Sequence, residues 1–175
     1  MIYFTSDLHL GHDNVLGFCD RPFKNVKEMN EALLENWNKR VKKDDTIYVL
    51  GDFALARPQQ FSYHLNGRKY LVPGNHDRRW LKDLEEDFEI LPPLCELVNS
   101  SQSITLCHYA MRTWPRSHYG AWHLFGHSHG NLPPYGKSFD VGVDCNNYSP
   151  ISLDEVKERM SKLEWRHADY HDRAN

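Results

Sequence analysis

The chain has 175 residues, of which 40% are hydrophobic and 26% are charged, and its formal net charge is −3 at pH 7. This composition excludes a disordered chain and predicts a single globular domain over residues 1–175 with a buried core. The slightly negative net charge means that the protein as a whole does not attract nucleic acid. Nucleic acid therefore remains a partner only if basic residues gather in a local patch.

Four cysteines are scattered along the chain without CxxC pairing, at Cys19, Cys95, Cys107 and Cys145. We interpret them as reduced thiols rather than as disulfides or a zinc site. The chain begins Met1-Ile2-Tyr3-Phe4, without the basic segment of a signal peptide, and it has no apolar run long enough to cross a membrane. We therefore expect a cytoplasmic protein without a membrane partner.

Short apolar segments rich in β-branched and aromatic residues predict strands along the chain. Most of them end in glycine or polar residues, which punctuate secondary structure. Two further apolar segments, 88–91 and 94–98, fall between the third and the fourth strand. The predicted strands cover residues 2–5, 46–50, 69–72, 103–107, 122–125 and 139–143.

Amphipathic segments predict helices that supply core packing rather than chemistry. Apolar residues recur at spacings of three and four within residues 26–41, after a capping box formed by Asn25 and Glu28. A second capping box, formed by Ser152 and Glu155, opens a helix near the end of the chain. The chain is thus predicted to be a compact α/β domain.

Two shorter helices are expected in the middle of the chain. One has Pro58 in its first turn. The other follows the sharp turn at Pro73-Gly74 and carries apolar residues from Trp80 to Leu84 on one face. Aspartate is a preferred N-cap residue, so Asp77 is expected to cap this helix.

Polar clusters of histidine, aspartate and asparagine follow directly after five predicted strands. In open α/β sheets, ligands bind in the crevice beyond the carboxyl ends of the strands, so five separate segments would bring these residues to one rim. We expect Asp7 and His9 to point to the same side of an extended segment, because side chains alternate with a period of two. The clusters are Asp7/His9, Asp52, Asn75/His76, His108 and His127/His129.

The residue types in these clusters suit divalent metal ions. Imidazole with carboxylate and amide oxygen, and no thiolate, fits Mn, Fe, Zn, Co or Ni better than a structural cysteine-type zinc site. Seven candidate ligands exceed what one tetrahedral ion needs, and they divide into two sites if Asp52 bridges. Two ions about 3.5–4 Å apart generate hydroxide at neutral pH and clamp a phosphoryl group. The competing interpretation, histidines that only satisfy core hydrogen bonds, would bury many polar groups without a ligand.

This ordered set of motifs resembles that of the calcineurin-like metallophosphoesterase family. Small bacterial and phage members of the family are similar to the chain in length. The resemblance implies an α/β fold, a four-layer αββα sandwich of two mixed β-sheets flanked by helices. The motifs that carry it are Asp7-x-His9, Gly51-Asp52, Gly74-Asn75-His76-Asp77, His108 and Gly126-His127-x-His129.

Carried over by motif position, the resemblance implies a ligand set for each of two metal ions. The first set is Asp7, His9, Asp52 and His129. The second set is Asp52, Asn75, His108 and His127, with Asp52 bridging.

The resemblance also implies a catalytic role for His76. This histidine would lie beside the substrate phosphate and protonate the leaving group, while hydroxide between the metals attacks phosphorus. In the Ser/Thr protein phosphatases of the family, a second aspartate follows the Gly-Asp motif and pairs with this histidine. Here Asp52 is followed by Phe53-Ala54-Leu55. The difference argues against a protein phosphatase and leaves the partner of His76 unassigned.

Three further residues are candidates for contacting the substrate, although each also fits surface charge or packing. His12 follows the first ligand pair closely, and Arg21 is a candidate for holding a phosphate. Arg112 lies in a stretch of basic and aromatic residues, 111–119, of the kind found in nucleotide and single-strand binders. The expected substrate is a nucleotide-like or other small phosphoester, cleaved by a phosphodiesterase or phosphatase with Mn as the favoured metal.

Two other functions remain open on the sequence alone. One is a non-catalytic metal-binding scaffold of the same fold, although such relatives usually lack some of the ligand residues and none is missing here. The other is a dinuclear hydrolase of non-phosphate esters or amides.

Overall fold

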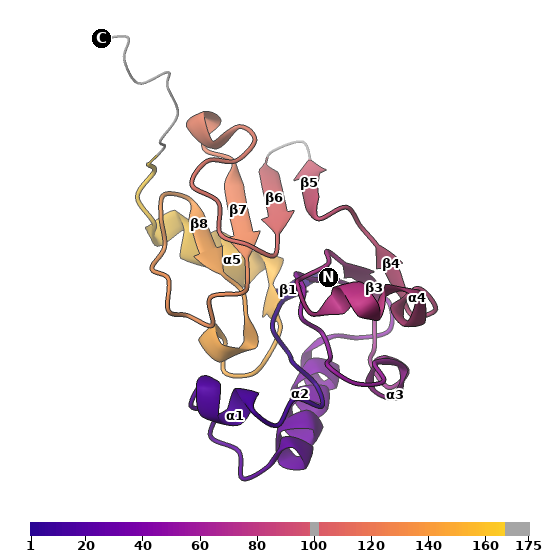
Figure 1. Cartoon of the computed structure of the whole chain (residues 1–175). Helices are drawn as coiled ribbons and strands as arrows, with labels where there is room; N and C mark the ends of the chain where they lie inside the picture. Colours follow the sequence, from indigo (N-terminus) through magenta and orange to yellow (C-terminus); the bar gives the residue numbers. More distant parts are fainter. Residues whose placement is uncertain (99–101, 167–175) are drawn as a thin grey trace, which may run out of the picture.

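Two β-sheets form the centre of the protein in a computed structural model that describes residues 1–98 and 102–166 (Figure 1). The first sheet has the strand order β4-β3-β2-β1-β9, and the second has the order β5-β6-β7-β8. The strands are β1 (Ile2–Thr5), β2 (Thr46–Val49), β3 (Arg68–Leu71), β4 (Phe88–Ile90), β5 (Leu94–Val98), β6 (Ser103–Cys107), β7 (Trp122–Phe125), β8 (Ser138–Asp140) and β9 (Ile151–Ser152).

Both sheets are mixed. Strands β1 to β4 pair in parallel, whereas β9 joins β1 in antiparallel orientation. In the second sheet β6, β7 and β8 are parallel and β5 is antiparallel to β6. Helices flank the sheets (Figure 1), which confirms the predicted α/β class with two mixed sheets. The parallel strands all have their carboxyl ends at one edge of their sheet, which is where the polar clusters follow.

Consecutive apolar residues explain how the first sheet is buried on both faces. Tyr3 packs into a core cluster with Met29, Leu33 and Trp37, whereas the next residue, Phe4, packs into a second cluster that also contains residues of β6 and β7. Side chains alternate across a strand, so a continuous apolar run is what a strand buried on both faces requires.

The helices pack against these two clusters. Val156 and Met160 of α5 lie in the second cluster, and α2 supplies the apolar residues of the first. Among residues 1–98 and 102–166, no helix is both long enough and apolar enough to cross a bilayer. The α-helices are α1 (Val15–Phe18), α2 (Val26–Arg40), α3 (Gln59–Ser62), α4 (Leu81–Leu84) and α5 (Leu153–Lys162), and the short 3-10 helices are η1 (Asp77–Arg79), η2 (Ser117–Tyr119) and η3 (Val143–Cys145).

The two predicted capping boxes have different outcomes. The box of Ser152 and Glu155 is confirmed at the start of α5. At the start of α2, the Asn25 side chain accepts the N–H of Glu28, but the Glu28 carboxylate accepts the N–H of Lys24 instead of that of Asn25. Only half of that box is therefore present.

The strand predicted at residues 139–143 is shorter in the structure. Strand β8 ends at Asp140, whose carboxylate accepts the N–H of Gly142, and η3 begins at Val143. The apolar pattern of this segment is a consequence of burial and not of a continuing strand.

We expect Leu33→Ala to lower the free energy of unfolding by about 2–5 kcal/mol, because it opens a cavity in a fully buried cluster. Chemical denaturation measures this change. Glu35→Ala, on the exposed face of the same helix, should change it by less than about 0.5 kcal/mol. Equal effects of the two variants would contradict the packing described for α2.

Candidate metal centre

The segments that follow β1 and β2 run side by side beyond the end of the sheet. The N–H of Asp7 donates to the carbonyl of Gly51, and the N–H of His9 donates to the carbonyl of Asp52, both at 3.0 Å. The second sheet is joined to them by the N–H of His127, which donates to the Asp7 carboxylate at 2.8 Å. Both sheets therefore contribute to one rim.

Five of the seven predicted ligands have backbone conformations in the left-handed region. Such conformations cost non-glycine residues of order 1–3 kcal/mol and are concentrated at functional sites. The expectation that an extended backbone places Asp7 and His9 on one side is therefore wrong, although the two side chains do come together. The φ angles are 57° for Asp7, 50° for His9, 55° for Asp52, 65° for His127 and 47° for His129.

Two glycines let the carboxylates approach the backbone. A Cβ atom at Gly74 would lie 2.4 Å from Oδ1 of Asp52, and one at Gly126 would lie 2.5 Å from Oδ2 of Asp7. Both distances are shorter than any contact that a methyl group tolerates. The glycines of the Gly-Asn-His-Asp and Gly-His-x-His motifs are thus required by space at the site.

The structure brings the seven candidate ligands together in two adjoining groups. Ligand atoms of Asp7, His9 and His129 all lie within 4.8 Å of one another, as do those of Asp52, His108 and His127. The seventh, Asn75, has its Oδ1 3.0 Å from Nε2 of His108.

Asp52 lies between the two groups. Its Oδ2 is 3.7 Å from Nε2 of His9 in the first group and 3.5 Å from Nε2 of His108 in its own group. A carboxylate in this position can contact two ions at once. We refer to the two groups and Asn75 together as the metal cluster.

Several buried atoms of the metal cluster have no hydrogen-bond partner among the described residues. They are Oδ1 of Asp7 and both ring nitrogens of His9. A buried polar atom without a partner costs about 1–3 kcal/mol. Carboxylate oxygen and imidazole nitrogen are ligands for divalent transition metals, so the residues present fit such ions.

Burial and neighbouring charges shift the pKa values of the cluster residues in different directions. Burial raises the pKa of Asp7 to about 7 and lowers the pKa of His9 to about 3. Burial alone would lower the pKa of His108, but its contact with Asp52 raises this pKa to about 9. Burial acts in the opposite sense on Asp52, whose pKa is nevertheless lowered to about 2 by His108.

Asp77 is not the N-cap that was predicted, because its side chain makes no capping contact. Its fully buried carboxylate instead accepts three backbone N–H groups, from Asp52 at 2.7 Å, Gly74 at 2.8 Å and Phe53 at 3.0 Å. It therefore joins the segment after β2 to the turn after β3. The prediction failed because two of the three partners of Asp77, Asp52 and Phe53, are distant in sequence.

Arg21 does not have a guanidinium available for phosphate. The residue is buried, and its five N–H groups are directed at the carboxylate of Asp144, the carbonyls of Asp7 and Leu8, and the sulfur of Met29. It holds the backbone of the first ligand pair in place. The prediction that Arg21 contacts the substrate is thus corrected to a supporting role behind the site.

Two aspartates outside the sequence motifs support the candidate ligands. Asp144 accepts from Nδ1 of His129 at 2.7 Å, which leaves Nε2 of that ring for a ligand contact. Asp140 accepts the hydroxyl of Ser128 at 2.6 Å and the N–H of Gly130 at 3.1 Å. Neither aspartate occurs in a motif, so no signal in a single sequence could have identified it.

His76 and His12 lie beside the metal cluster. The backbone N–H of His76 donates to Oδ1 of Asp52 at 2.9 Å, and its ring is half-exposed, with Nε2 3.9 Å from Oδ2 of Asp52. The ring of His12 is centred 5.5 Å from that of His9 and 6.5 Å from that of His76. Both residues are at the rim where a substrate would bind.

Arg112 is not brought to the metal cluster. It is exposed, and its guanidinium lies 4.4 Å from the centre of the Tyr135 ring. Together with Leu132 it lines a separate cavity of 340 Å³.

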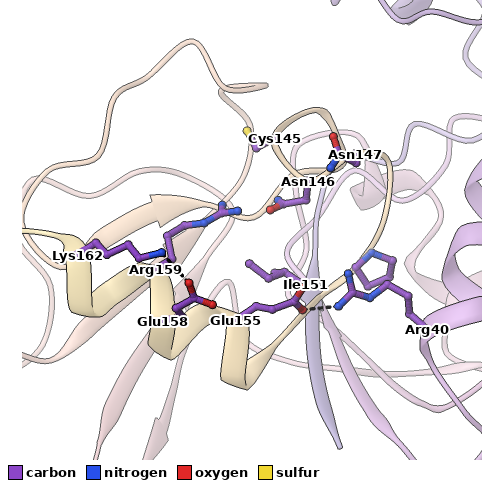
Figure 2. A pocket seen from close by; sticks show the side chains of 10 residues that line it. Arg40, Cys145, Asn146, Asn147, Ile151, Glu155, Glu158, Arg159 and Lys162 are labelled. Atoms are coloured by element: carbon purple, nitrogen blue, oxygen red, sulfur yellow. Dashed lines mark hydrogen bonds and ion pairs between the residues drawn. The ribbon is translucent and has the colours of Figure 1, made fainter.

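A cavity of 480 Å³ lies beside α5, and Figure 2 shows the side chains that line it. Its polar lining includes Arg40, which bonds to Glu155, and Lys162, which bonds to Glu158. None of its lining residues belongs to the metal cluster.

Comparisons with known proteins find a matching family, sequence relatives and a similar fold. A sequence model described as calcineurin-like phosphoesterase matches residues 1–153. An uncharacterized protein of Methanocaldococcus jannaschii is 32% identical over 177 aligned residues, which cover 92% of each chain. The Gene 66 protein of Mycobacterium phage L5 is 36% identical over 81 residues, which cover 43% of this chain and 39% of the phage protein.

A crystal structure of a protein of unknown function from Aquifex aeolicus has a similar fold. The TM-score is 0.73 at 26% sequence identity, and the match covers 91% of this chain and 98% of that chain.

We expect Asp77→Asn to lower the free energy of unfolding by about 1–3 kcal/mol, because an amide has one acceptor oxygen for three buried N–H groups. Denaturation monitored by tryptophan fluorescence measures this. The exposed variant Glu86→Gln is the control and should be close to neutral. A neutral Asp77→Asn would contradict the role given to Asp77.

We expect metal binding to release protons, and to release more of them as the pH falls from about 9 to about 6. The pKa of His108 is about 9 and that of Asp7 is about 7, so both groups increasingly carry protons over this range and must lose them to bind an ion. A pH indicator in weakly buffered solution, titrated with Mn, measures the release. Proton release that is constant over the range would contradict these ionisation states.

Proposed function

Since this chain belongs to the calcineurin-like phosphoesterase family, we propose that it hydrolyses small phosphoesters with the help of two divalent metal ions. Its membership makes it a metal-dependent phosphoesterase. The observation that carries the dinuclear proposal is the position of Asp52, whose Oδ2 lies 3.5–3.7 Å from histidines of two adjoining ligand groups.

The proposed ligand sets follow these two groups, with Asp52 shared. Buried atoms of Asp7 and His9 without partners support the first set. Mn is the ion we favour, and Fe, Zn, Ni and Co suit the same donors. The first set is Asp7, His9, Asp52 and His129, and the second is Asp52, Asn75, His108 and His127.

Hydrogen bonds from Nδ1 orient two of the histidine rings for metal binding. Nδ1 of His108 lies 2.7 Å from the carbonyl of Leu50, which can only accept, so Nδ1 carries the proton and Nε2 is directed at Asp52. In the same way, Nδ1 of His129 donates to the carboxylate of Asp144 and leaves Nε2 for the metal. A metal-ligating histidine commonly donates its other ring N–H in this way. When bound, the ions supply charge stabilisation and lower the pKa of water so that it can attack phosphorus.

His76 is the proposed general acid. Its ring is half-exposed at the edge of the cluster, and its backbone is fixed by the hydrogen bond from its N–H to Asp52. From this position an imidazolium can donate a proton to the oxygen of the leaving group. We propose that His12, whose ring is centred 5.5 Å from that of His9, lies beside the substrate phosphate.

The proposal also covers the setting of the enzyme. We treat residues 1–175 as one catalytic domain, since the family match extends to residue 153 and the following α5 packs into the shared core. We propose a cytoplasmic location because all four cysteines are free thiols, as reducing compartments favour.

The test is hydrolysis of bis(p-nitrophenyl) phosphate and of β-glycerophosphate, an alkyl phosphoester whose leaving group has a high pKa, by the Mn-loaded protein. His76→Gln should reduce kcat for β-glycerophosphate by about 10²–10⁴-fold because it removes proton donation, and should reduce it less for the p-nitrophenyl ester, whose leaving group departs readily as an anion. Asp52→Asn should remove bound metal as well as activity. His64→Gln, an exposed histidine on the segment after α3, is the control and should retain full activity.

Full activity in His76→Gln and Asp52→Asn would refute the proposal. Metal loading is measured in each variant by elemental analysis. Loss of activity with full metal content is the result expected for His76→Gln alone.

A further inference from the structure

A cavity of 430 Å³ adjoins the metal cluster on the side of Asn75 and His108. Its wall includes Gly74 and His108, so it begins at residues of the second ligand group. Its volume falls in the range of about 300–1,000 Å³ that is usual for small-molecule sites. We call it the Leu91 cavity.

The walls of the Leu91 cavity come from the ends of three strands. Pro73 follows β3, Leu91 follows β4, and Cys107 ends β6. The N–H of Leu91 donates to the carbonyl of Leu71, which fixes this segment against the first sheet. With Leu81 and Ile90 also in the lining, most of the surface offered to a ligand is apolar. Such a surface favours an apolar group that leaves water.

Two polar side chains border this apolar surface. The ring of Tyr109 is 43% exposed and centred 5.0 Å from the ring of His108 and 4.7 Å from that of His127. Arg78 is exposed, lines the cavity, and makes no ion pair with any residue in the ranges 1–98 and 102–166.

The neighbouring Arg79 neither lines the cavity nor has a guanidinium without contacts. Its guanidinium donates to the carbonyl of Leu55 and lies 5.2 Å from the centre of the Trp80 ring, and it does not line the cavity. The Leu91 cavity thus combines an apolar wall, an exposed aromatic ring at the metal cluster and one available cation.

We propose that the Leu91 cavity binds a planar aromatic substituent of the phosphoester, and that Arg78 binds an anionic group at the far end of that substituent. This inference rests on the proposed function, because the phosphoryl group must be held at the metal cluster. The substrate class is therefore an aryl-type or nucleoside-type phosphoester that carries a second negative charge. Stacking on Tyr109 and burial of the ring against Leu91 supply the selectivity for the aromatic group.

The test for the aromatic group uses two phosphonates that are not hydrolysed. Methylphosphonate and phenylphosphonate present the same anion to the Mn-loaded protein and differ in the ring alone, and calorimetry measures both dissociation constants. We expect phenylphosphonate to bind at least about tenfold more tightly. Leu91→Asn should bring the ratio close to one while leaving methylphosphonate binding unchanged, which also shows that this variant is folded.

Leu132→Asn is the matched control, since Leu132 is an exposed leucine that lines the separate cavity near Arg112. It should retain the preference for phenylphosphonate. Equal affinity of the two phosphonates for the unmodified protein, or a preference that survives Leu91→Asn, would overturn the inference, as would a preference that is lost equally in Leu132→Asn. Binding of methylphosphonate with no preference would overturn this inference while supporting the metal site, whereas binding of neither would refute the proposed function itself.

The test for Arg78 adds a carboxylate at the para position of phenylphosphonate. We expect 4-carboxyphenylphosphonate to bind more tightly than phenylphosphonate by about threefold to tenfold, as a partly exposed charge pair allows. Arg78→Gln should abolish this gain and Arg79→Gln should preserve it. No gain in the unmodified protein, or a gain that Arg78→Gln retains, would overturn the role given to Arg78.

Discussion

Buried carboxylates that accept backbone N–H groups hold the metal cluster together. Asp77 ties the segment after β2 to the turn after β3, and Asp7 ties the first sheet to the second through the N–H of His127. Asp140 fixes the segment that carries His127 and His129. These bonds explain how five of the candidate ligands are kept at positive φ, because a strained backbone persists only where its surroundings determine it. The two-sheet architecture brings the strand ends near one another, but the carboxylates set the final geometry.

Burying so many acids and histidines is unfavourable unless positive charge is supplied. Arg21 supplies part of it behind the cluster, where it bonds to Asp144 and to the carbonyl of Asp7. Inside the cluster the buried carboxylates lack a full complement of positive charge, since burial raises the pKa of Asp7 to about 7 and lowers the pKa of His9 to about 3. Two divalent ions would remove the conflict, because they favour the deprotonated form of every donor. The buried donor groups that are unfavourable in a protein core are therefore the same groups that would bind divalent metal ions.

The sequence predicted the parts of this site that depend on local order. Strand-then-ligand order predicted that the seven candidate ligands and His76 would lie at one rim, since parallel strands end at one edge and the motifs follow them directly, and the structure brings these residues together. It failed where partners are distant in sequence. The local sequence predicts a helix cap at Asp77, but this residue binds the segment after β2. It predicts a substrate contact for Arg21, but the guanidinium binds Asp144, which lies more than a hundred residues away. The backbone of Asp7 and His9 was expected to be extended, because nothing local reveals the bonds that impose positive φ.

The same geometry bears on the missing partner of His76. The next residue, Asp77, is turned inward with its carboxylate occupied by three N–H groups, so it cannot also serve the ring. The carboxylate near the ring belongs to Asp52, at 3.9 Å, and Asp52 is shared with His9 and His108. General-acid assistance matters most for leaving groups of high pKa and least for those that leave readily as anions. The aryl-type substrate proposed for the apolar cavity that begins at His108 and is bordered by Tyr109 has a leaving group of this second kind.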